Sequence, residues 1–291
     1  GLRKHNPDAV LYCNGGDNRQ MKETLPWTQW IGEEGGFIGY APLTGEFPFN
    51  AGLAAKKMEY RARGRARIVF SDSAFKVFDY HIHPQGEIAR IYAGTISNGA
   101  SPWFGVNPAR NKAPGIQTIY RFNRLVHEHR EALTNGESLA EAAILESLLN
   151  VQLAGTVQAA SGDDVHKREA AAQRLAVPRH LDEFHGLYAA FCRSGYPFDV
   201  VDEDLLLGGE LPSRIKLIVL PGVGAVSDSL AERLRRFVAG GGRLLATFDT
   251  SLFDEQGVRR KDFALADVFG ARVESELIGP SVLDYLGVET R

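Results

Sequence analysis

The sequence predicts an α/β protein built from two successive modules. Short apolar runs alternate with amphipathic stretches of helical period along almost the whole chain, a pattern typical of βα units and parallel sheets. The charge balance changes near residue 133. Residues 1–133 hold 17 Lys+Arg and 12 Asp+Glu, a net of +5, whereas the remainder holds 16 and 24, a net of −8. Because 291 residues suffice for two ordinary domains, we divide the chain into modules 1–133 and 134–291.

The first module contains four predicted strands separated by helices. The strands are 8–16, 28–36, 65–73 and 100–107, and the helices are 49–64, 86–99 and 116–133. Four βα units amount to half of an eight-stranded (β/α)8 TIM barrel. An open half would leave bare sheet edges, so we expect either a missing half before Gly1 or a small open sheet. A chain that begins with glycine favours the missing half.

The order of strands and helices in the second module predicts a doubly wound, flavodoxin-like sheet. Its strands are 140–147, 197–203, 215–222 and 243–249, and its helices are 182–195 and 227–242. Ser227 is the expected N-cap of the last helix, which places Leu230 and Leu234 on one apolar face. The polar stretch 155–183 is interpreted as a loop or a helical excursion.

The stretch KLIVLPGVGAVSDSLAERLRRFVAGGGRLLATFD (216–249) resembles the trimerisation domain of family 42 β-galactosidases. The resemblance covers roughly residues 138–274 and implies a class I glutamine-amidotransferase-like fold that serves assembly into a homo-oligomer. True amidotransferases carry a cysteine on the turn after a strand. Here the corresponding turns read Pro221-Gly222 and Phe248-Asp249, so we expect no nucleophilic chemistry in this module.

The stretches WIGEEGGF (30–37) and HIHPQGEIARIYAGTISNGASPWFGVN (81–107) resemble glycoside hydrolases related to those galactosidases and to α-L-fucosidases. This resemblance covers about residues 1–130. It implies that the first module is the C-terminal part of a glycosidase-type barrel.

The candidate catalytic residues are Glu33, Glu34 and Asp72, which stand at predicted strand ends, where (β/α) barrels place their chemistry. Glycosidic cleavage usually needs two carboxyl groups flanking the bond. Adjacent strand residues point to opposite faces, so only one of Glu33 and Glu34 can face the barrel mouth. Asp17, Asp72 or an upstream strand would supply the second carboxylate. The alternative is that Glu33 and Glu34 are loop carboxylates without a catalytic task.

Polar and aromatic residues near the same strand ends are candidates for binding a sugar, whose C–H faces pack on aromatic rings. The expected substrate-binding residues are Asn14, Asp17, Trp30, His81, His83, Trp103 and Asn107. Trp27, Gln29, Phe37, Tyr40 and Phe104 also flank the expected mouth. The alternative for each aromatic residue is ordinary core packing.

No metal or cofactor is expected. His81-x-His83 lacks a cysteine or carboxylate that would complete a metal site, and His127-x-His129 lies in a helix, where residues two apart diverge. Cys13 and Cys192 form no disulfide framework and are compatible with a reducing compartment, so a cytoplasmic location is favoured. The absence of a long apolar run argues against a membrane span.

One basic cluster, Lys56, Lys57, Arg61, Arg63, Arg65 and Arg67, is interpreted as a solvated helix face. It has no aromatic stacking platform, so we expect no nucleic-acid partner. The favoured function is a glycoside hydrolase that acts on a carbohydrate and is truncated in this chain. The alternative is a non-catalytic carbohydrate-binding or assembly protein with a degenerate barrel.

Overall fold

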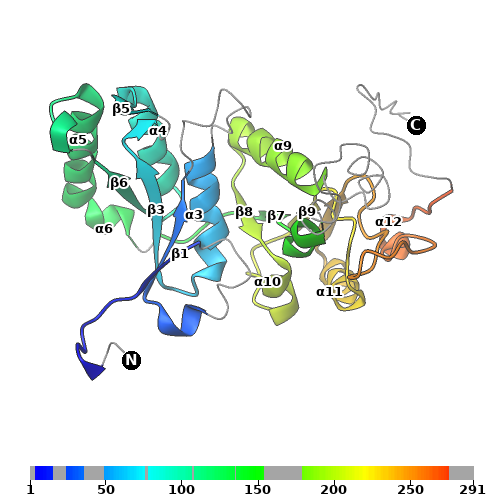
Figure 1. Cartoon of the computed structure of the whole chain (residues 1–291). Coiled ribbons are helices and arrows are strands. Elements are labelled where there is room, and N and C mark those ends of the chain that lie inside the picture. Colours follow the sequence, from blue (N-terminus) through cyan, green and yellow to red (C-terminus); the bar gives the residue numbers. More distant parts are fainter. Residues whose placement is uncertain are drawn as a thin grey trace, which may run out of the picture. The chain divides into compact units, whose positions relative to one another are not determined.

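A computed structural model describes residues 4–15, 24–35, 49–75, 78–106, 108–134, 136–153 and 179–274 (Figure 1). The chain divides into two compact units. Unit 1 consists of Gly1–Leu148 and Phe184–Val219, and unit 2 consists of Leu149–Glu183 and Leu220–Arg291.

The first sheet belongs to unit 1 and has four parallel strands in the order β1-β2-β3-β6. These strands are β1 (Tyr12–Asn14), β2 (Trp30–Glu34), β3 (Ala66–Asp72) and β6 (Ser101–Gly105). The helices of this part are α3 (Asn50–Arg61), α4 (Gln85–Ile96), α5 (Pro114–Glu128) and α6 (Arg130–Leu133). All four predicted strands and all three predicted helices are therefore confirmed, although each observed strand is shorter than its predicted range.

A hairpin of the first module was not predicted. Strands β4 (Ala74–Phe75) and β5 (Phe78–Ile82) form an antiparallel hairpin directly after β3. The backbone N–H of His83 then donates to the carbonyl of Ser73 at 2.9 Å, which returns the chain to the end of β3. A strand of two residues is too short to show a period of two in the sequence, so pattern alone could not reveal the hairpin.

The two faces of the first sheet differ in their surroundings. On one face Ile31 and Val69 are buried against Ala55 and Met58 of α3 and Ile91 of α4. Since residues two apart on a strand share a face and paired residues of parallel neighbours do likewise, Tyr12, Trp30, Phe70 and Trp103 lie together on the other face. There Trp30 and Trp103 are 45% and 49% exposed.

Aromatic side chains meet across the open face. Tyr12 and Trp103 belong to the first and last strands of the sheet, yet their ring centroids are 5.5 Å apart. Three strand spacings in a flat sheet would separate the two backbones by about 14 Å. The two long side chains therefore lean toward each other over the strands between them.

The second sheet has the strand order β10-β9-β7-β8, and the boundary between the two units runs within β9. The strands are β7 (Ala142–Leu145), β8 (Phe198–Val201), β9 (Leu217–Leu220) and β10 (Arg243–Ala246). β7 pairs in parallel with both β8 and β9, and all four of its residues are buried. The helices here are α9 (Arg179–Ser194), α10 (Glu203–Gly208), α11 (Asp228–Ala239) and α12 (Ala266–Phe269).

Helix α11 forms as its sequence predicts. The Oγ of Ser227 accepts a hydrogen bond from the backbone N–H of Leu230 at 3.2 Å, which caps the helix, and Leu230 and Leu234 are buried. After the helix, Gly241 adopts a φ of 93°, which favours glycine. The protein is therefore an α/β fold with parallel sheets, as predicted.

The basic cluster on α3 is not the solvated face that was expected. Lys57 and Arg61 bind the carboxylate of Glu146 at 2.6 and 2.9 Å, and Arg61 also binds Asp202 at 2.8 Å. The Lys57 and Arg61 side chains are only 14% and 10% exposed. Arg63, at 61% exposure, is the member of the cluster that does face solvent. All of these residues belong to unit 1, so this network holds α3 against the β7–β8 part of the second sheet.

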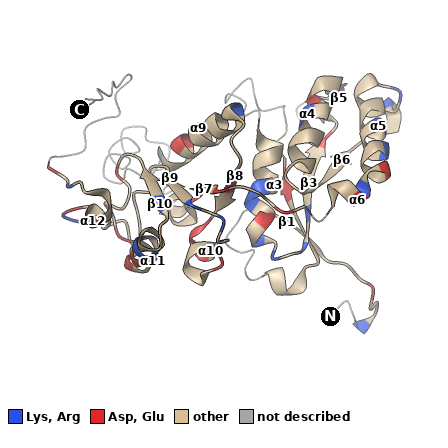
Figure 2. Cartoon of the chain, turned by 180° about the vertical axis from the view of Figure 1, so that it is seen from behind, with Lys and Arg blue, Asp and Glu red and all other residues tan. Residues whose placement is uncertain are grey.

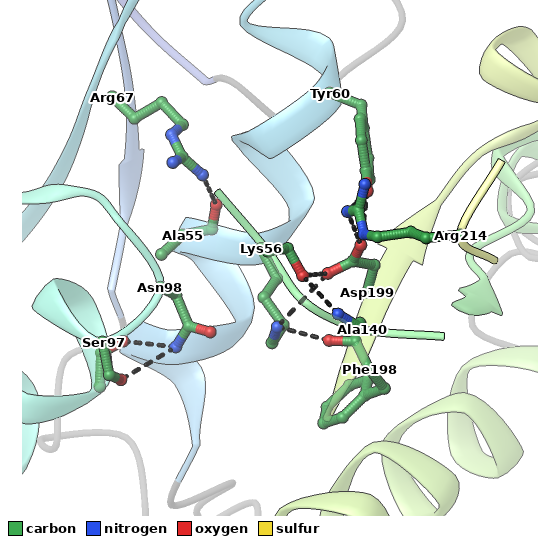
Figure 3. Close-up of polar contacts among 12 residues, drawn as sticks. Ala55, Lys56, Tyr60, Arg67, Ser97, Asn98, Ala140, Phe198, Asp199 and Arg214 are labelled. Carbon is green, nitrogen blue, oxygen red and sulfur yellow. Dashed lines mark hydrogen bonds and ion pairs between the residues drawn. The ribbon is translucent and has the colours of Figure 1, made fainter. Parts of the chain in front are cut away.

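A second part of the same network surrounds Asp199, whose side chain is fully buried. Figure 3 shows Lys56 and Tyr60 of α3 directed toward Asp199 and Arg214. The Tyr60 hydroxyl donates to the Asp199 carboxylate at 2.5 Å, Ser138 donates at 2.6 Å, and Arg214 donates at 2.8 Å. Figure 2 shows acidic and basic residues interspersed on α3 and α5, and also on α11 of the second module. The positive charge of the first module is therefore not concentrated on one helix.

Candidate functional site

The carboxyl ends of the four parallel strands meet at one edge of the first sheet. The residues at this edge are Asn14 of β1, Glu33 and Glu34 of β2, Asp72 of β3 and Gly105 of β6. The edge therefore brings together the carboxylates that the sequence singled out.

The strand register separates the roles of Glu33 and Glu34. Glu33 is paired with Val69 and so lies on the face covered by α3 and α4, where it is half-buried. Glu34 is paired with Phe70, lies on the open aromatic face and is exposed. Glu34 is thus the member of the pair that faces the open side of the sheet.

The end of β2 is fixed by Gly35. Its backbone N–H donates to the carbonyl of Phe70 at 2.7 Å, which continues the ladder with β3. A Cβ at this position would lie 2.5 Å from Val69 Cγ1 and 2.9 Å from Ser71 Oγ. Only glycine allows this close approach, so packing against β3 explains why residue 35 of the Glu-Glu-Gly-Gly sequence is glycine.

Asp72 lies on the same face as Glu34, two residues beyond Phe70 on the neighbouring strand. One strand spacing across and two residues along place the Cα atoms of Glu34 and Asp72 about 8 Å apart. The Oδ1 of Asp72 accepts the backbone N–H of Ala74 at 3.3 Å, which fixes the carboxylate at the start of the hairpin. This spacing leaves room for the two carboxyl groups to lie on either side of a bond in a bound ligand.

The Tyr12 ring lies near the carboxylates of β2. Burial raises the pKa of the Tyr12 phenol, and the charges of Glu33 and Glu34 raise it further. The Tyr12 hydroxyl donates to Asn14 Oδ1 at 3.4 Å.

Three aromatic rings lie on the open face beside the carboxylates. Trp103 contacts Tyr12 and Phe70 edge-to-face, with centroid separations of 5.5 and 5.4 Å and interplanar angles of 71° and 72°. Tyr12 reaches Trp103 by lying over Gly32, where a Cβ would come within 2.1 Å of its hydroxyl. Tyr12 and Phe70 were not among the predicted site residues, and their signal is positional, since each shares a face with Glu34 once the register is known.

Several expected site residues lie elsewhere. Trp30 begins β2, so it stands at the amino end of the strand, four residues before Glu34. Trp27 and Gln29 precede that strand. Phe104 packs against the buried helix-side core. The sequence shows that a residue is near a strand but not toward which end of the sheet its side chain lies.

His83 is 2% exposed, because it follows the hairpin and is covered by the structure around it. Burial lowers the pKa of its imidazole, and the nearby charges of Asp72 and Glu87 oppose that effect. It was expected to bind substrate, and the structure places it almost completely buried after the hairpin. Asp17, Phe37, Tyr40 and Asn107 lie outside the described residues, as does the side chain of His81.

In the described ranges no group of three or more His, Cys, Asp or Glu side chains is arranged to hold a metal ion. Both Cys13 and Cys192 are free thiols. No helix within the described ranges is both long enough and apolar enough to cross a bilayer. A separate cavity of about 360 Å³ in unit 1 is lined by residues of α3, α4 and α9, among them Gly52, Gly94, Asn98 and Cys192, and contains none of the edge carboxylates.

Comparison with known proteins supports the sequence resemblance. Residues 164–282 match the family model described as the β-galactosidase trimerisation domain. A stretch of 68 residues is 41% identical to the β-galactosidase BglY of Alicyclobacillus acidocaldarius subsp. acidocaldarius, which is 23% of this chain and 9% of that protein. The predicted relationship to the β-galactosidases and their trimerisation domain is thereby confirmed.

Solved structures share the fold over nearly the whole chain. The β-galactosidase of Bacillus circulans sp. alkalophilus superposes with a TM-score of 0.67 at 15% identity, over 92% of this chain and 40% of its own. The β-galactosidase of Halorubrum lacusprofundi gives 0.65 at 19% identity, over 94% and 43%. The α-L-fucosidase isoenzyme 2 of Paenibacillus thiaminolyticus gives 0.51 at 19%, over 84% and 33%. The chain spans less than half the length of each of these three enzymes.

Proposed function

We propose that this chain is part of a glycoside hydrolase whose two working carboxyl groups are Glu34 and Asp72. The observation that carries the proposal is their placement on one open face of adjacent parallel strands, at the edge where the strands end. Their Cα spacing of about 8 Å is compatible with the carboxyl separations of about 5–10 Å found in glycosidases.

The chemistry follows from that placement. One carboxylic acid donates a proton to the oxygen of the leaving group as the glycosidic C–O bond breaks. The other carboxylate either attacks the anomeric carbon or removes a proton from the water that attacks it.

The finer features of the fold belong to the same proposal. The first sheet would be the C-terminal half of a (β/α)8 barrel, within a module 1–133, since its helices lie on one face and its aromatic face is open. Module 134–291 would be the flavodoxin-like, amidotransferase-like assembly domain, through which the protein forms a homo-oligomer. The match of residues 164–282 to a trimerisation domain supports this part.

The test is a set of charge-neutral variants, made in the polypeptide encoded by the complete reading frame that contains this chain. Aryl β-galactosides and aryl α-L-fucosides are the probes. We expect Glu34→Gln and Asp72→Asn each to lower kcat by about 10²–10⁴-fold. Glu33→Gln is the matched control, because Glu33 is the next residue but lies on the other face.

Two results would count against the proposal. If Glu34→Gln and Asp72→Asn both hydrolyse the probes at the parental rate, the carboxyl pair is assigned wrongly. If the parent binds saccharides but hydrolyses no glycoside, the alternative of a non-catalytic carbohydrate-binding protein is favoured instead.

A further inference from the structure

Gly105, which has no side chain, ends the last strand of the first sheet beside Asp72 of the candidate site. On the open aromatic face, Glu34, Phe70 and Trp103 form one layer across three strands. Asp72 and Gly105 form the next layer toward the carboxyl edge. Because Gly105 has only hydrogen at Cα, the position beside the Asp72 carboxylate and above the aromatic rings is left unfilled by its own strand.

The fold does not require glycine at this position. A Cβ at Gly105 would meet Asp72 Oδ1 at 3.6 Å and Phe70 Cζ at 3.6 Å, which is ordinary van der Waals contact. Gly105 is also absent from the glycines with a positive φ. By contrast, a Cβ at Gly32 or Gly35 would come within 2.1 or 2.5 Å of neighbouring atoms. Glycine is thus explained by packing at positions 32 and 35 but not at position 105.

The unfilled position has the surroundings of a sugar subsite. An atom placed there would touch a carboxylate oxygen on one side and an aromatic carbon on the other. Trp103, in the layer below, is 49% exposed and is held edge-on between Tyr12 and Phe70. A pyranose ring satisfies both demands, because its C–H face packs on an aromatic ring while a hydroxyl group donates to a carboxylate.

We propose that Gly105 determines specificity by leaving space for a pyranose ring beside Asp72, over the ring pair Phe70–Trp103. The inference rests on the proposed function and extends it to the position of the sugar. A methyl group at residue 105 would fit the fold but would occupy the space of the ligand. Substitution should therefore weaken sugar binding and hydrolysis while leaving the folded state intact.

The experiment compares Gly105→Ala with Gly86→Ala, in the polypeptide from the complete reading frame. Gly86 is a matched control, since a Cβ there meets nothing within 4 Å. The readouts are kcat/KM for aryl glycosides, the tryptophan fluorescence change on titration with D-galactose and L-fucose, and the urea midpoint. We expect Gly105→Ala to lower kcat/KM and saccharide affinity by roughly 10- to 200-fold while the urea midpoint stays unchanged. We expect Gly86→Ala to change neither kcat/KM nor saccharide affinity.

The outcomes separate this inference from the proposed function. If no glycoside is hydrolysed but the sugars still bind, and Gly105→Ala weakens that binding, the subsite stands and the hydrolase proposal fails. Binding and hydrolysis at parental levels in Gly105→Ala would overturn the subsite. Loss of the folded state in that variant would overturn it as well, since glycine would then be a requirement of packing. A parent that neither binds the sugars nor hydrolyses the glycosides would overturn both.

Discussion

Glu146→Gln removes the buried negative charge that holds α3 against the second sheet. Glu146 is 4% exposed and binds Lys57 at 2.6 Å and Arg61 at 2.9 Å, both of which are nearly buried. The substitution keeps the shape of the side chain and leaves two cations with one carboxylate fewer. Breaking a buried ion pair in this way costs about 3–5 kcal/mol of unfolding free energy. With a urea m-value of about 3 kcal/mol/M, the midpoint should fall by about 1–2 M.

The effect should depend on pH in a defined direction. Burial raises the pKa of Glu146, but the charges of Lys57 and Arg61 and their hydrogen bonds outweigh it, so the net pKa lies below the ordinary 4.5. A carboxyl group whose pKa is lowered by folding contributes stability above its unfolded pKa and loses it as the pH falls through the folded value. The difference between parent and variant should therefore be full at pH 7 and shrink below pH 4.5.

Tryptophan fluorescence is the decisive assay, because all three tryptophans of the chain, Trp27, Trp30 and Trp103, lie in the first sheet region of unit 1. Glu146 follows β7 in the second sheet, so a fluorescence midpoint that falls with Glu146→Gln shows coupling between the sheets. Glu232→Gln is the control, since its pairs with Arg235 and Arg236 are exposed and 3.8–4.0 Å long, and it should stay within about 0.5 kcal/mol of the parent. An unchanged fluorescence midpoint in Glu146→Gln would refute the reasoning.

Three further variants test separate packing arguments by urea unfolding. Gly32→Ala places a methyl group where the Tyr12 ring lies, so it should lower the free energy of unfolding by about 1–3 kcal/mol. It should also reduce the near-UV circular dichroism of the cluster of Tyr12, Phe70 and Trp103. A near-UV spectrum like that of the parent would contradict this. Tyr60→Phe removes a hydroxyl donor to the buried Asp199 and should cost about 1–3 kcal/mol. Ser227→Ala removes the cap of α11 and should cost about 1 kcal/mol, and no loss would mean that water replaces the cap.

The elements of this fold were predictable where one strand or helix carries its own signal. β9 is an uninterrupted apolar run, and α11 has a serine cap, an apolar stripe and a following glycine turn, so each is specified locally. The basic side chains of α3 were misjudged for the opposite reason. The partner of Lys56 at the Phe198 carbonyl lies 142 residues away, and those of Arg61 lie 85 and 141 residues away. A local pattern cannot show whether a charge will meet solvent or a distant carboxylate.

The candidate site was likewise predictable only in part. That Glu33 and Glu34 stand at a strand end, and that only one of them can face the open side, follows from the sequence and from strand alternation. Which one does so depends on the pairing of β2 with β3, and that pairing is a property of the whole sheet. Gly105 shows the limit most clearly. In sequence it is one glycine among many, and only the distances around its missing Cβ distinguish it from Gly32 and Gly35.

The boundary of the trimerisation match and the boundary of the compact units do not coincide, and the reason is physical. The match begins at residue 164, after β7, yet β7 lies between β8 and β9 and pairs with both. β7 and β8 also share a hydrophobic core with Leu53 of α3, which the Glu146 and Asp199 networks reinforce. A segment cut at residue 164 would leave β8 and β9 without the strand between them and would expose the apolar side chains that α3 covers. Folding of the matched segment therefore depends on residues of the first module, because the first module supplies one wall of the core on which the matched strands pack.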